Sequence, residues 1–313
     1  MKGKNMKKIL VSGLINIETT LNIEKFPLEY SPVRYLFNET YTSVSGVGFN
    51  IAKSLNTLGS KIEFISILGK DIAGELARKQ IEEENIQTHY ILDSEKTMTP
   101  QSTILYDKDG NRQINVDLKD IQKIRIKNEL IDEASINCNI AALCNINFTR
   151  DHLKRLSNKM LIATDVHAID NIHDEYNRDY LEYSDILFFS HEKIQLKEKE
   201  FIKELNYIFP KKIIICGLGK DGALMYSAKS KKTFHFPAIN SFKVVNTIGA
   251  GDALFSSFLH FFNKDIGEQE ALKKAVFFAG KKIGKKGAAE GFLKEKELET
   301  VVDSYPSYRY KEV

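Results

Sequence analysis

The chain has 313 residues, of which 42% are hydrophobic and 28% are charged, as in ordinary globular proteins and unlike disordered or fibrous ones. Its formal net charge is only +3 and its basic residues are interspersed with acidic ones, so it lacks the clustered basic face typical of nucleic-acid-binding proteins. It has no apolar run near the roughly 18 residues that would span a membrane, and its three cysteines, without metal-ligand spacing, indicate a reducing, cytoplasmic compartment rather than a disulfide framework or a zinc site.

Strand-like and helix-like segments alternate along most of the chain. Short apolar runs bounded by polar residues or glycine predict strands, at Lys8–Ser12, Ile62–Leu68, Ile140–Cys144, Met160–Asp165, Asp185–Phe189 and Lys212–Cys216. Amphipathic patterns predict helices, at Phe49–Leu58, Ala73–Glu84, Asp151–Ser157, Glu192–Leu205, Ala250–Phe262 and Glu268–Ile283. The alternation predicts an α/β fold with a doubly wound, mostly parallel sheet and helices on both faces. We expect a single domain over residues 1–313.

Two segments interrupt this alternation. Glu18–Val44 is long, contains two prolines and has no helical period, and Ser102–Asp117 predicts two strands around an Asp-Gly turn. Long insertions in a compact domain are usually functional. We therefore interpret residues 18–44 and 102–117 as a small β-sheet that forms a lid, with a pair of surface hairpins as the alternative.

The sharpest motif is the run Val-Val-Asn-Thr-Ile-Gly-Ala-Gly-Asp-Ala at residues 244–253, where a turn of small residues opens into a helix. Gly249, Ala250 and Gly251 leave room for a ligand to approach the backbone, and the helix start favours an anion there. Asp252 is placed to accept the proton of an attacking hydroxyl while the amides stabilise the transferred group. Taken alone, the run also fits a simple helix cap.

Further glycine turns follow the same pattern. Ser45-Gly46-Val47-Gly48-Phe49-Asn50 opens a second helix, and Asn50 in its first turn can face a pocket. Leu68–Gly74 lies between a strand and a helix, and Ile213–Ala223 runs from a strand into a glycine-rich turn.

With these motifs in this order, the chain resembles the ribokinase-like, pfkB-type carbohydrate kinases from about Lys8 to Tyr305. The family's C-terminal signature, Asp-Thr-x-Gly-Ala-Gly-Asp, is matched by Asn246–Asp252, and its glycine-rich N-terminal signature is matched by Gly46–Asn50. The resemblance implies a kinase that uses ATP with Mg²⁺ to phosphorylate a hydroxyl of a sugar or of a sugar-containing small molecule. It also implies a homodimer formed through the lid.

The resemblance assigns a role to each matched residue. It makes Asp252 the general base and Gly249, Ala250 and Gly251 the anion hole. The residues assigned to substrate binding are Asn16, Glu18, Gly46, Gly48 and Asn50. Those assigned to the nucleotide phosphates are Gly217, Gly219 and Gly222, and those near the adenine are Ala279, Ile283, Gly287 and Ala288.

Three departures from the family pattern concern the substrate and the cation. Glu18 stands where the family usually has Asp, which changes its reach, and Ser45 replaces a glycine and narrows the approach. Asn246 replaces the first Asp of the signature, a position that in relatives helps shape a monovalent-cation site, so potassium activation stays open.

A fourth departure concerns magnesium. The family usually carries Asn-x-x-Glu after the strand that matches Asp185–Phe189, whereas this chain has Ser-His-Glu-Lys at residues 190–193. Either Glu192 substitutes as the metal ligand after a one-residue shift, or phosphates and water alone hold Mg²⁺. We interpret His191 as a surface residue.

Two groups of basic residues have a simple interpretation. Lys281, Lys282, Lys285 and Lys286 are read as a solvated helix end, with steering of an anionic ligand as the alternative. Arg34 and Arg112 in the lid segments are read as facing water.

Several functions remain as alternatives. Asn246 and the Cys144-Asn145-Ile146 run are similar to pseudouridine kinases, so a nucleoside is an alternative substrate. An inactive sensor of sugars or nucleotides is the alternative from another class. A Rossmann dehydrogenase or a P-loop kinase would need glycine motifs that do not occur in this sequence.

Overall fold

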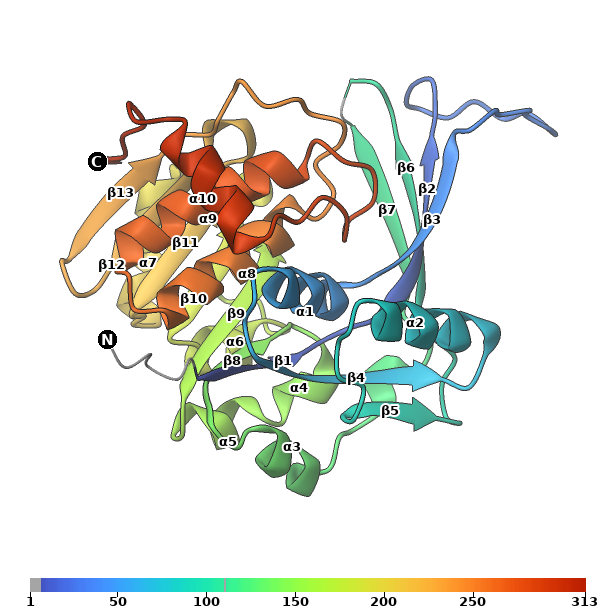
Figure 1. Ribbon diagram of the computed structural model, residues 1–313, viewed down its shortest axis with the longest axis horizontal. Coiled ribbons are helices and arrows are strands. Elements are labelled where there is room, and N and C mark those ends of the chain that lie inside the picture. Colours follow the sequence, from blue (N-terminus) through green and yellow to red (C-terminus); the bar gives the residue numbers. More distant parts are fainter. Residues whose placement is uncertain (1–6, 110) are drawn as a thin grey trace.

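The computed structural model describes residues 7–109 and 111–313 and contains one large and one small β-sheet (Figure 1). The ten-stranded sheet has the order β14-β13-β12-β11-β10-β9-β8-β1-β4-β5. Its parallel strands are β1 (Lys8–Ser12), β4 (Ile62–Gly69), β5 (Ile91–Ser94), β8 (Cys138–Leu143), β9 (Leu161–Ala168), β10 (Ile186–Ser190) and β11 (Ile213–Gly217). Its antiparallel edge strands are β12 (Ala223–Ser227), β13 (Lys232–Phe236) and β14 (Lys311–Glu312).

The apolar strands of the large sheet are buried on both faces. In β11, Ile213 and Ile215 belong to one hydrophobic cluster, whereas Ile214 and Cys216 belong to the other. Successive side chains of a strand point to opposite faces, so each cluster lies on one face of the sheet. A continuous apolar run is therefore what such a strand requires.

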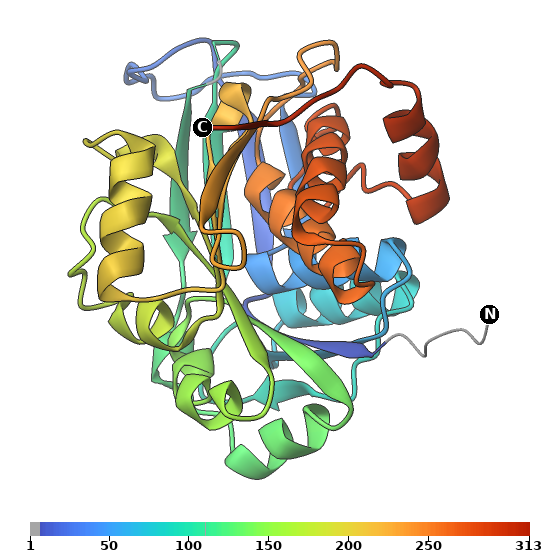
Figure 2. The same cartoon turned by 90° about the vertical axis from the view of Figure 1, so that its left-hand side faces the viewer.

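Helices cover both faces of the large sheet (Figure 2). One cluster includes side chains of α1 (Val47–Thr57), α2 (Ile72–Glu83), α8 (Ala250–Asn263), α9 (Glu268–Lys282) and α10 (Glu295–Asp303). The other includes side chains of α3 (Asn128–Ala134), α4 (Asn147–Arg150), α5 (Leu153–Ser157), α6 (Arg178–Tyr183) and α7 (Glu198–Ile208). The predicted doubly wound α/β fold is confirmed. Within the described residues, no helix combines the length and the apolar character that crossing a membrane requires.

The small sheet has the order β3-β2-β6-β7. Its strands are β2 (Asn16–Asn22), β3 (Thr40–Ser45), β6 (Gln101–Tyr106) and β7 (Arg112–Asp117). The hairpins β2–β3 and β6–β7 are antiparallel, and their inner strands β2 and β6 pair in parallel. The predicted small sheet is confirmed, although it begins at Asn16 rather than Glu18 because Asn16 already pairs with Ser45. Its action as a lid stays a prediction.

Two predicted helices differ from the structure. The segment predicted as a helix from Glu192 begins with a 3₁₀ turn, η2 (His191–Lys193), and α7 starts only at Glu198. Glu198 and Glu200 lie in the first turn of α7, where the helix dipole favours acidic residues. In the segment Asp151–Ser157, Asp151 caps the end of α4 and the short helix α5 begins only at Leu153.

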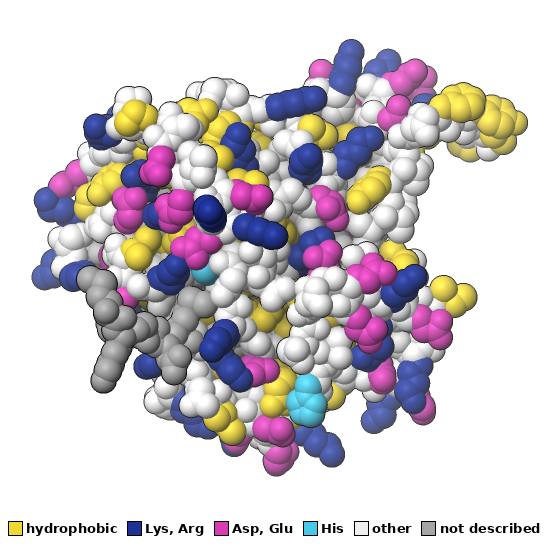
Figure 3. Space-filling view, viewed as in Figure 1, with side chains coloured by type: hydrophobic (Ala, Val, Ile, Leu, Met, Phe, Trp, Pro, Cys, Tyr) yellow, Lys and Arg dark blue, Asp and Glu magenta, His cyan; other side chains and the backbone are white. Residues whose placement is uncertain are grey.

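The tip of the small sheet carries exposed apolar side chains (Figure 3). In Figure 3 they form the hydrophobic projection at the upper right, over the β2–β3 connection. Those with 44–93% exposure are Leu28, Tyr30, Val33, Tyr35, Leu36 and Phe37. This arm is unusual, because large apolar side chains seldom gather on the surface of a monomer without a role.

Candidate active site

The turn before α8 presents the start of that helix. The Asn246 side chain accepts a hydrogen bond from the backbone N–H of Ile248 at 3.1 Å. Gly249 caps α8 with a φ of 75°, and a Cβ atom there would lie 2.4 Å from the backbone oxygen of Ala288, so only glycine fits. The first amides of a helix have no partner inside it, and they attract an anion.

Asp252 lies in the first turn of α8 and is only 8% exposed. Its Oδ2 atom accepts a hydrogen bond from Asn50 Nδ2 at 2.7 Å. Burial raises the pKa of Asp252, and the charge of Asp165 adds to this increase, whereas the Asn50 hydrogen bond and the charges of His167 and Lys282 oppose it. A buried carboxylate with a raised pKa is a better proton acceptor than an exposed one.

A chain of polar contacts leads from Asp252 to the small sheet. Ser45 Oγ lies 3.4 Å from Asn50 Oδ1 and 3.2 Å from Glu18 Oε2. A hydroxyl has one proton to donate, so it serves one of these oxygens at a time. Burial raises the pKa of Glu18, and the hydrogen bond from Ser45 opposes the increase. Ser45, read from sequence only as narrowing the approach, thus joins Glu18 to Asn50.

Asn16 and Glu18 each have one side-chain oxygen without a hydrogen-bond donor among the described residues. Asn16 Nδ2 donates to Ser102 Oγ at 3.0 Å, while the buried Asn16 Oδ1 and Glu18 Oε1 find no donor among the described residues. Leaving a buried acceptor unpaired costs about 1–3 kcal/mol. Both residues lie on β2 of the small sheet.

Gly46 and Gly48 have packing reasons to be glycine. A Cβ atom on Gly46 would lie 2.6 Å from the Leu14 backbone oxygen, and one on Gly48 would lie 2.3 Å from the Gly13 carbonyl carbon. The connection from β1 to β2 therefore runs directly against the start of α1. This close packing positions Asn50 relative to β2, and it gives both glycines a role that needs no ligand contact.

The glycines predicted to bind the nucleotide phosphates lie where β11 ends. Gly217 pairs with Ser190 of the neighbouring strand β10. The turn that follows is η3 (Gly219–Asp221), and an added Cβ at Gly219 would approach only His191 Nε2, at 3.9 Å. Gly222 is closely packed instead, because a Cβ there would lie 1.9 Å from the Phe236 backbone oxygen. The turn is thus open at Gly219 and anchored at Gly222.

Arg112 joins the small sheet to both sides of the site. Its guanidinium donates to Thr247 Oγ1 at 2.7 Å and to Glu192 Oε1 at 2.8 Å. The interpretation that Arg112 faces water is therefore wrong. The sequence indicated only that Arg112 lies on an exposed hairpin strand. Its partners Thr247 and Glu192 are far away in the chain, so their pairing with Arg112 could be seen only in the folded structure.

Glu192 is the one predicted metal ligand. Its side chain is 55% exposed and forms an ion pair with Arg112. Across residues 7–109 and 111–313, no three His, Cys, Asp or Glu side chains are grouped to hold a metal ion. Mg²⁺ commonly binds through one or two carboxylates together with water and phosphate oxygens, so Glu192 fits as a single protein ligand to Mg²⁺ bound by a triphosphate.

The residues predicted near the adenine lie in α9 and in the loop after it. Ala279 packs against the core, and the Ile283 backbone oxygen accepts from Val245 N at 2.8 Å. A Cβ on Gly287 would lie 2.9 Å from Tyr41 of β3, and Ala288 contacts Gly249. Gly287 and Ala288 therefore lie close to the small sheet and the anion hole, and the adenine contact stays a prediction.

Two residues at the end of β9 escaped the sequence analysis. An added Cβ on Gly251 would lie 3.7 Å from Asp165 Oδ2, and the His167 backbone N–H donates to Asp165 Oδ1 at 2.8 Å. His167 adopts a φ of 58°, an uncommon conformation for a residue with a side chain. Polar residues at the carboxyl end of a parallel strand were the available signal.

Lys282 is also in an unexpected place. It is the last residue of α9, and its side chain is 0% exposed. Its ammonium donates to the backbone oxygen of Ile248. The interpretation of Lys282 as part of a solvated helix end is therefore wrong.

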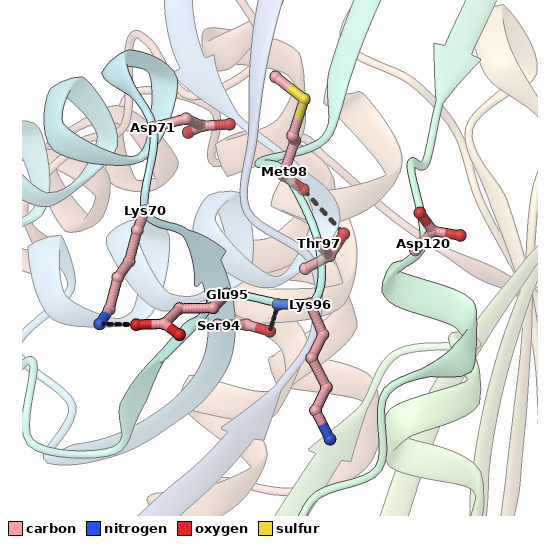
Figure 4. A pocket seen from close by; sticks show the side chains of 8 residues that line it. All are labelled: Lys70, Asp71, Ser94, Glu95, Lys96, Thr97, Met98 and Asp120. Atoms are coloured by element: carbon pink, nitrogen blue, oxygen red, sulfur yellow. Dashed lines mark hydrogen bonds and ion pairs between the residues drawn. The ribbon is translucent and has the colours of Figure 1, made fainter.

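A surface hollow of about 390 Å³ lies away from this site. Figure 4 shows it beside the β4–α2 turn, with Lys70 and Glu95 paired at 2.8 Å. Its lining residues are Lys70, Asp71, Ser94, Glu95, Lys96, Thr97, Met98 and Asp120. None of the residues predicted for substrate or nucleotide lines it.

The chain resembles known kinases over most of its length. A family model described as pfkB family carbohydrate kinase matches residues 6–295. The ribokinase of Dictyostelium discoideum is 25% identical over 322 aligned positions, covering 93% of this chain and 98% of that protein. The nucleoside kinase of Methanocaldococcus jannaschii is 23% identical, covering 82% of this chain and 84% of that protein.

A solved structure gives the same fold. A microbiome-derived acarbose kinase superimposes with a TM-score of 0.83 at 18% identity, covering 95% of this chain and 99% of that one.

Proposed function

This chain belongs to the pfkB family of carbohydrate kinases and is a sugar or nucleoside kinase, and we propose that Asp252 is its general base. The observation that carries this proposal is the environment of Asp252. The carboxylate is buried at the start of α8, holds one side-chain hydrogen bond, from Asn50, and lies beside the exposed Gly251. In the reaction, Asp252 accepts the proton of the substrate hydroxyl while the first amides of α8 stabilise the transferred phosphoryl group.

The acceptor substrate is a polyhydroxylated ring. Asn16 Oδ1 and Glu18 Oε1 are buried acceptors without donors in the described chain, and ligand hydroxyl groups would pair with both. A site built to bond hydroxyl groups rejects analogues that lack them, because its own polar groups are then left unpaired. We expect at least two hydroxyl groups of the substrate to bond to β2.

ATP is the phosphoryl donor, with its phosphates along the turn at Gly217–Gly222. Mg²⁺ bound to the triphosphate would neutralise its charge, and Glu192 is the carboxylate available to it. In the structure, Glu192 forms an ion pair with Arg112. If Glu192 bound the Mg²⁺ of Mg-ATP instead, the Arg112 guanidinium would lose this partner and would be free to bond to a phosphate near Thr247. Arg112 would then bond to the transferred phosphate and close the small sheet over it as a lid.

A nucleoside is a second candidate substrate. The Methanocaldococcus jannaschii relative is named a nucleoside kinase, and a nucleoside carries the same ribose hydroxyl groups as the sugar.

We also propose a homodimer in the cytoplasm. The exposed apolar side chains of the arm between β2 and β3 would be covered by a second copy of the chain. The three cysteines are free, which suits a reducing compartment. Light scattering coupled to size exclusion should give twice the mass of 35.7 kDa, and a monomer at micromolar concentration would contradict this part of the proposal.

The central experiment measures ADP release from Mg-ATP with a panel of sugars, sugar phosphates and nucleosides. The wild-type protein and Asp252→Asn are assayed side by side. One strong substrate that the variant fails to phosphorylate supports both the reaction and the base. If ligands shift the melting temperature without stimulating ADP release, the protein is a sensor and the proposed function is wrong.

A further inference from the structure

We propose that Lys282 is an internal cation of this site: its buried ammonium bonds to the turn before the anion hole and brings a fixed positive charge to the start of α8, where Asp252 lies. This inference rests on the proposed function, and it makes Lys282 a positioning residue, because its ammonium bonds to the protein backbone.

The first observation is the burial of a charge with a defined partner. Lys282 is 0% exposed, and moving an ammonium out of water is costly unless it is paired. Its ammonium donates to the Ile248 oxygen, one residue before the cap of α8 at Gly249. An apolar side chain would fill the same volume without the free-energy cost of burying a charge. The buried ammonium therefore indicates a specific role at this position.

The second observation is the charge around Lys282. Burial lowers the pKa of Lys282 to about 8, and the negative charges of Asp252, Glu18 and Glu290 oppose this change. Asp252 and Glu18 are themselves buried, and the charge of Asp252 raises the pKa of Glu18. The charge of Lys282 opposes the raised pKa of both carboxyl groups, which lie on separate elements, α8 and β2. A neutral side chain at this position would remove that positive charge from both.

The third observation is the geometry of the turn. The N–H of Ile248 donates to Asn246 Oδ1 at 3.1 Å, and the backbone oxygen of the same residue accepts a hydrogen bond from Lys282. Both polar groups around Ile248 are thus fixed. Because Gly249 and the first amides of α8 follow directly, the Lys282 bond sets the direction in which those amides point.

These observations predict how turnover responds to a lost ammonium. In Lys282→Met the side chain keeps its length and loses its charge. We expect kcat to fall at least 30-fold, with less than a threefold change in the KM for ATP, because the buried ammonium bonds to the backbone oxygen of Ile248. The acid limb of the kcat/KM profile should move to higher pH. The Lys282→Met substitution leaves the other groups that interact with Asp252 in place. These groups are Asn50, Asp165, His167 and Glu18.

A shorter side chain allows chemical rescue. Lys282→Ala leaves space beside the Ile248 oxygen, and potassium chloride or ethylammonium chloride supplies a small cation to fill it. We expect either salt to restore turnover at least fivefold in this variant and to leave the wild-type protein unchanged. Sodium sulfate and tetramethylammonium chloride are the controls for ionic strength and for a cation too large to enter.

Lys281→Met is the matched control. Lys281 is adjacent in α9, and its ammonium lies 4.0 Å from the centre of the Phe242 ring rather than at the turn. It should retain wild-type kcat and pH dependence. Circular dichroism and thermal melting establish which variants are folded.

The outcomes separate the two proposals. If Asp252→Asn is inactive and Lys282→Met turns over like wild type, the internal cation is wrong while the base stands. If folded Lys282→Met is slow but neither the pH profile moves nor the salts rescue Lys282→Ala, the lysine is only structural and the inference fails. If Asp252→Asn is active, the proposed base fails. The pKa of Asp252 can also be measured without substrate, by NMR titration of its carboxyl signal. This signal is assigned by its absence in Asp252→Asn. An unchanged Asp252 pKa in Lys282→Met would overturn the inference.

Discussion

Asp71 and Asp252 each lie beside a glycine turn at the start of a helix, yet their surroundings are opposite. Asp71 caps α2 and accepts hydrogen bonds from Gly74 N at 2.8 Å, from Thr99 N at 2.9 Å and from Thr99 Oγ1 at 2.7 Å. Asp252 accepts one side-chain hydrogen bond, from Asn50.

The pKa values follow the hydrogen bonds. For Asp71, burial alone would raise the pKa, but the hydrogen bonds from Thr99 and Gly74 outweigh it and lower the pKa. For Asp252, burial prevails and the pKa is raised. A carboxylate whose oxygens are all paired fastens two segments of chain together, whereas one with a spare oxygen can take a proton. Both residues are aspartates at the start of a helix, Asp71 as the cap of α2 and Asp252 within the first turn of α8. Their pKa values differ in direction because Asp71 accepts hydrogen bonds from more donors.

The largest expected effect is on turnover, in Asp252→Asn. We expect kcat to fall by about 10³-fold or more, since the variant loses both the base and its charge. Stability should stay the same or rise, because the neutral amide still accepts from Asn50 and no charge is buried. Steady-state kinetics and thermal melting of the purified variant test both parts, and near-wild-type turnover would contradict the comparison.

The next effect concerns Arg112, which links the small sheet to the Asp252 side of the site. Arg112→Met removes the hydrogen bonds to Thr247 and Glu192. We expect kcat/KM for ATP to fall about 10- to 100-fold, in line with the loss of one charge-assisted phosphate contact of about 1.5–3 kcal/mol. Arg34→Met, in the exposed arm, is the control and should leave kcat/KM unchanged. Equal values for the two variants would show that Arg112 has no phosphate role.

The pH dependence should distinguish the two aspartates. Asp252 must be ionised to act as a base, so kcat/KM should fall on the acid side at a pH above the ordinary aspartate pKa of about 3.9. Asp71 has a lowered pKa when folded, so its contribution to stability is present above the unfolded pKa and is lost as the pH falls through the folded one. Asp252, with a raised pKa, makes the opposite contribution and costs stability above its folded pKa. A kcat/KM plateau that extends down to pH 4 would contradict this assignment.

The smallest effect on activity is expected in Asp71→Asn. The amide can accept on one oxygen only, and its N–H groups would face the donors of Thr99. We expect a loss of about 1–2 kcal/mol in the free energy of unfolding, with kcat within about threefold of wild type. Urea denaturation and the kinetic assay check these values. A stable but inactive variant would mean that Asp71, too, has a part in catalysis.

Sequence reasoning predicted the large sheet well and the site in part. The strands Lys8–Ser12 and Ile213–Gly217 are apolar because both of their faces are covered, and this signal is local. Among the strands it missed, β5, β13 and β14 are short or partly exposed. The strand β12 was missed although it is largely buried and as long as β11. The turn at Gly249 could be predicted from the sequence because the residues that form it are contiguous in the chain.

Other parts of the site depend on chain segments that are far apart. Arg112 meets Glu192 across 80 residues, and Lys282 meets Ile248 across 34. A basic run at a helix end gives no local sign of which lysine turns inward. Ser45 was noticed only as a departure from a glycine, and its contacts with Glu18 and Asn50 required the small sheet and α1 to be placed together.

The parallel pairing of β2 and β6 has a mechanical consequence. Each hairpin of the small sheet enters it from the large sheet, and the two hairpins are joined along their inner strands (Figure 1). Neither hairpin can swing without pulling on the other. Asn16 and Glu18 on one hairpin and Arg112 on the other would therefore move together. If they have the roles proposed above, substrate binding and phosphate contact would be coupled in time.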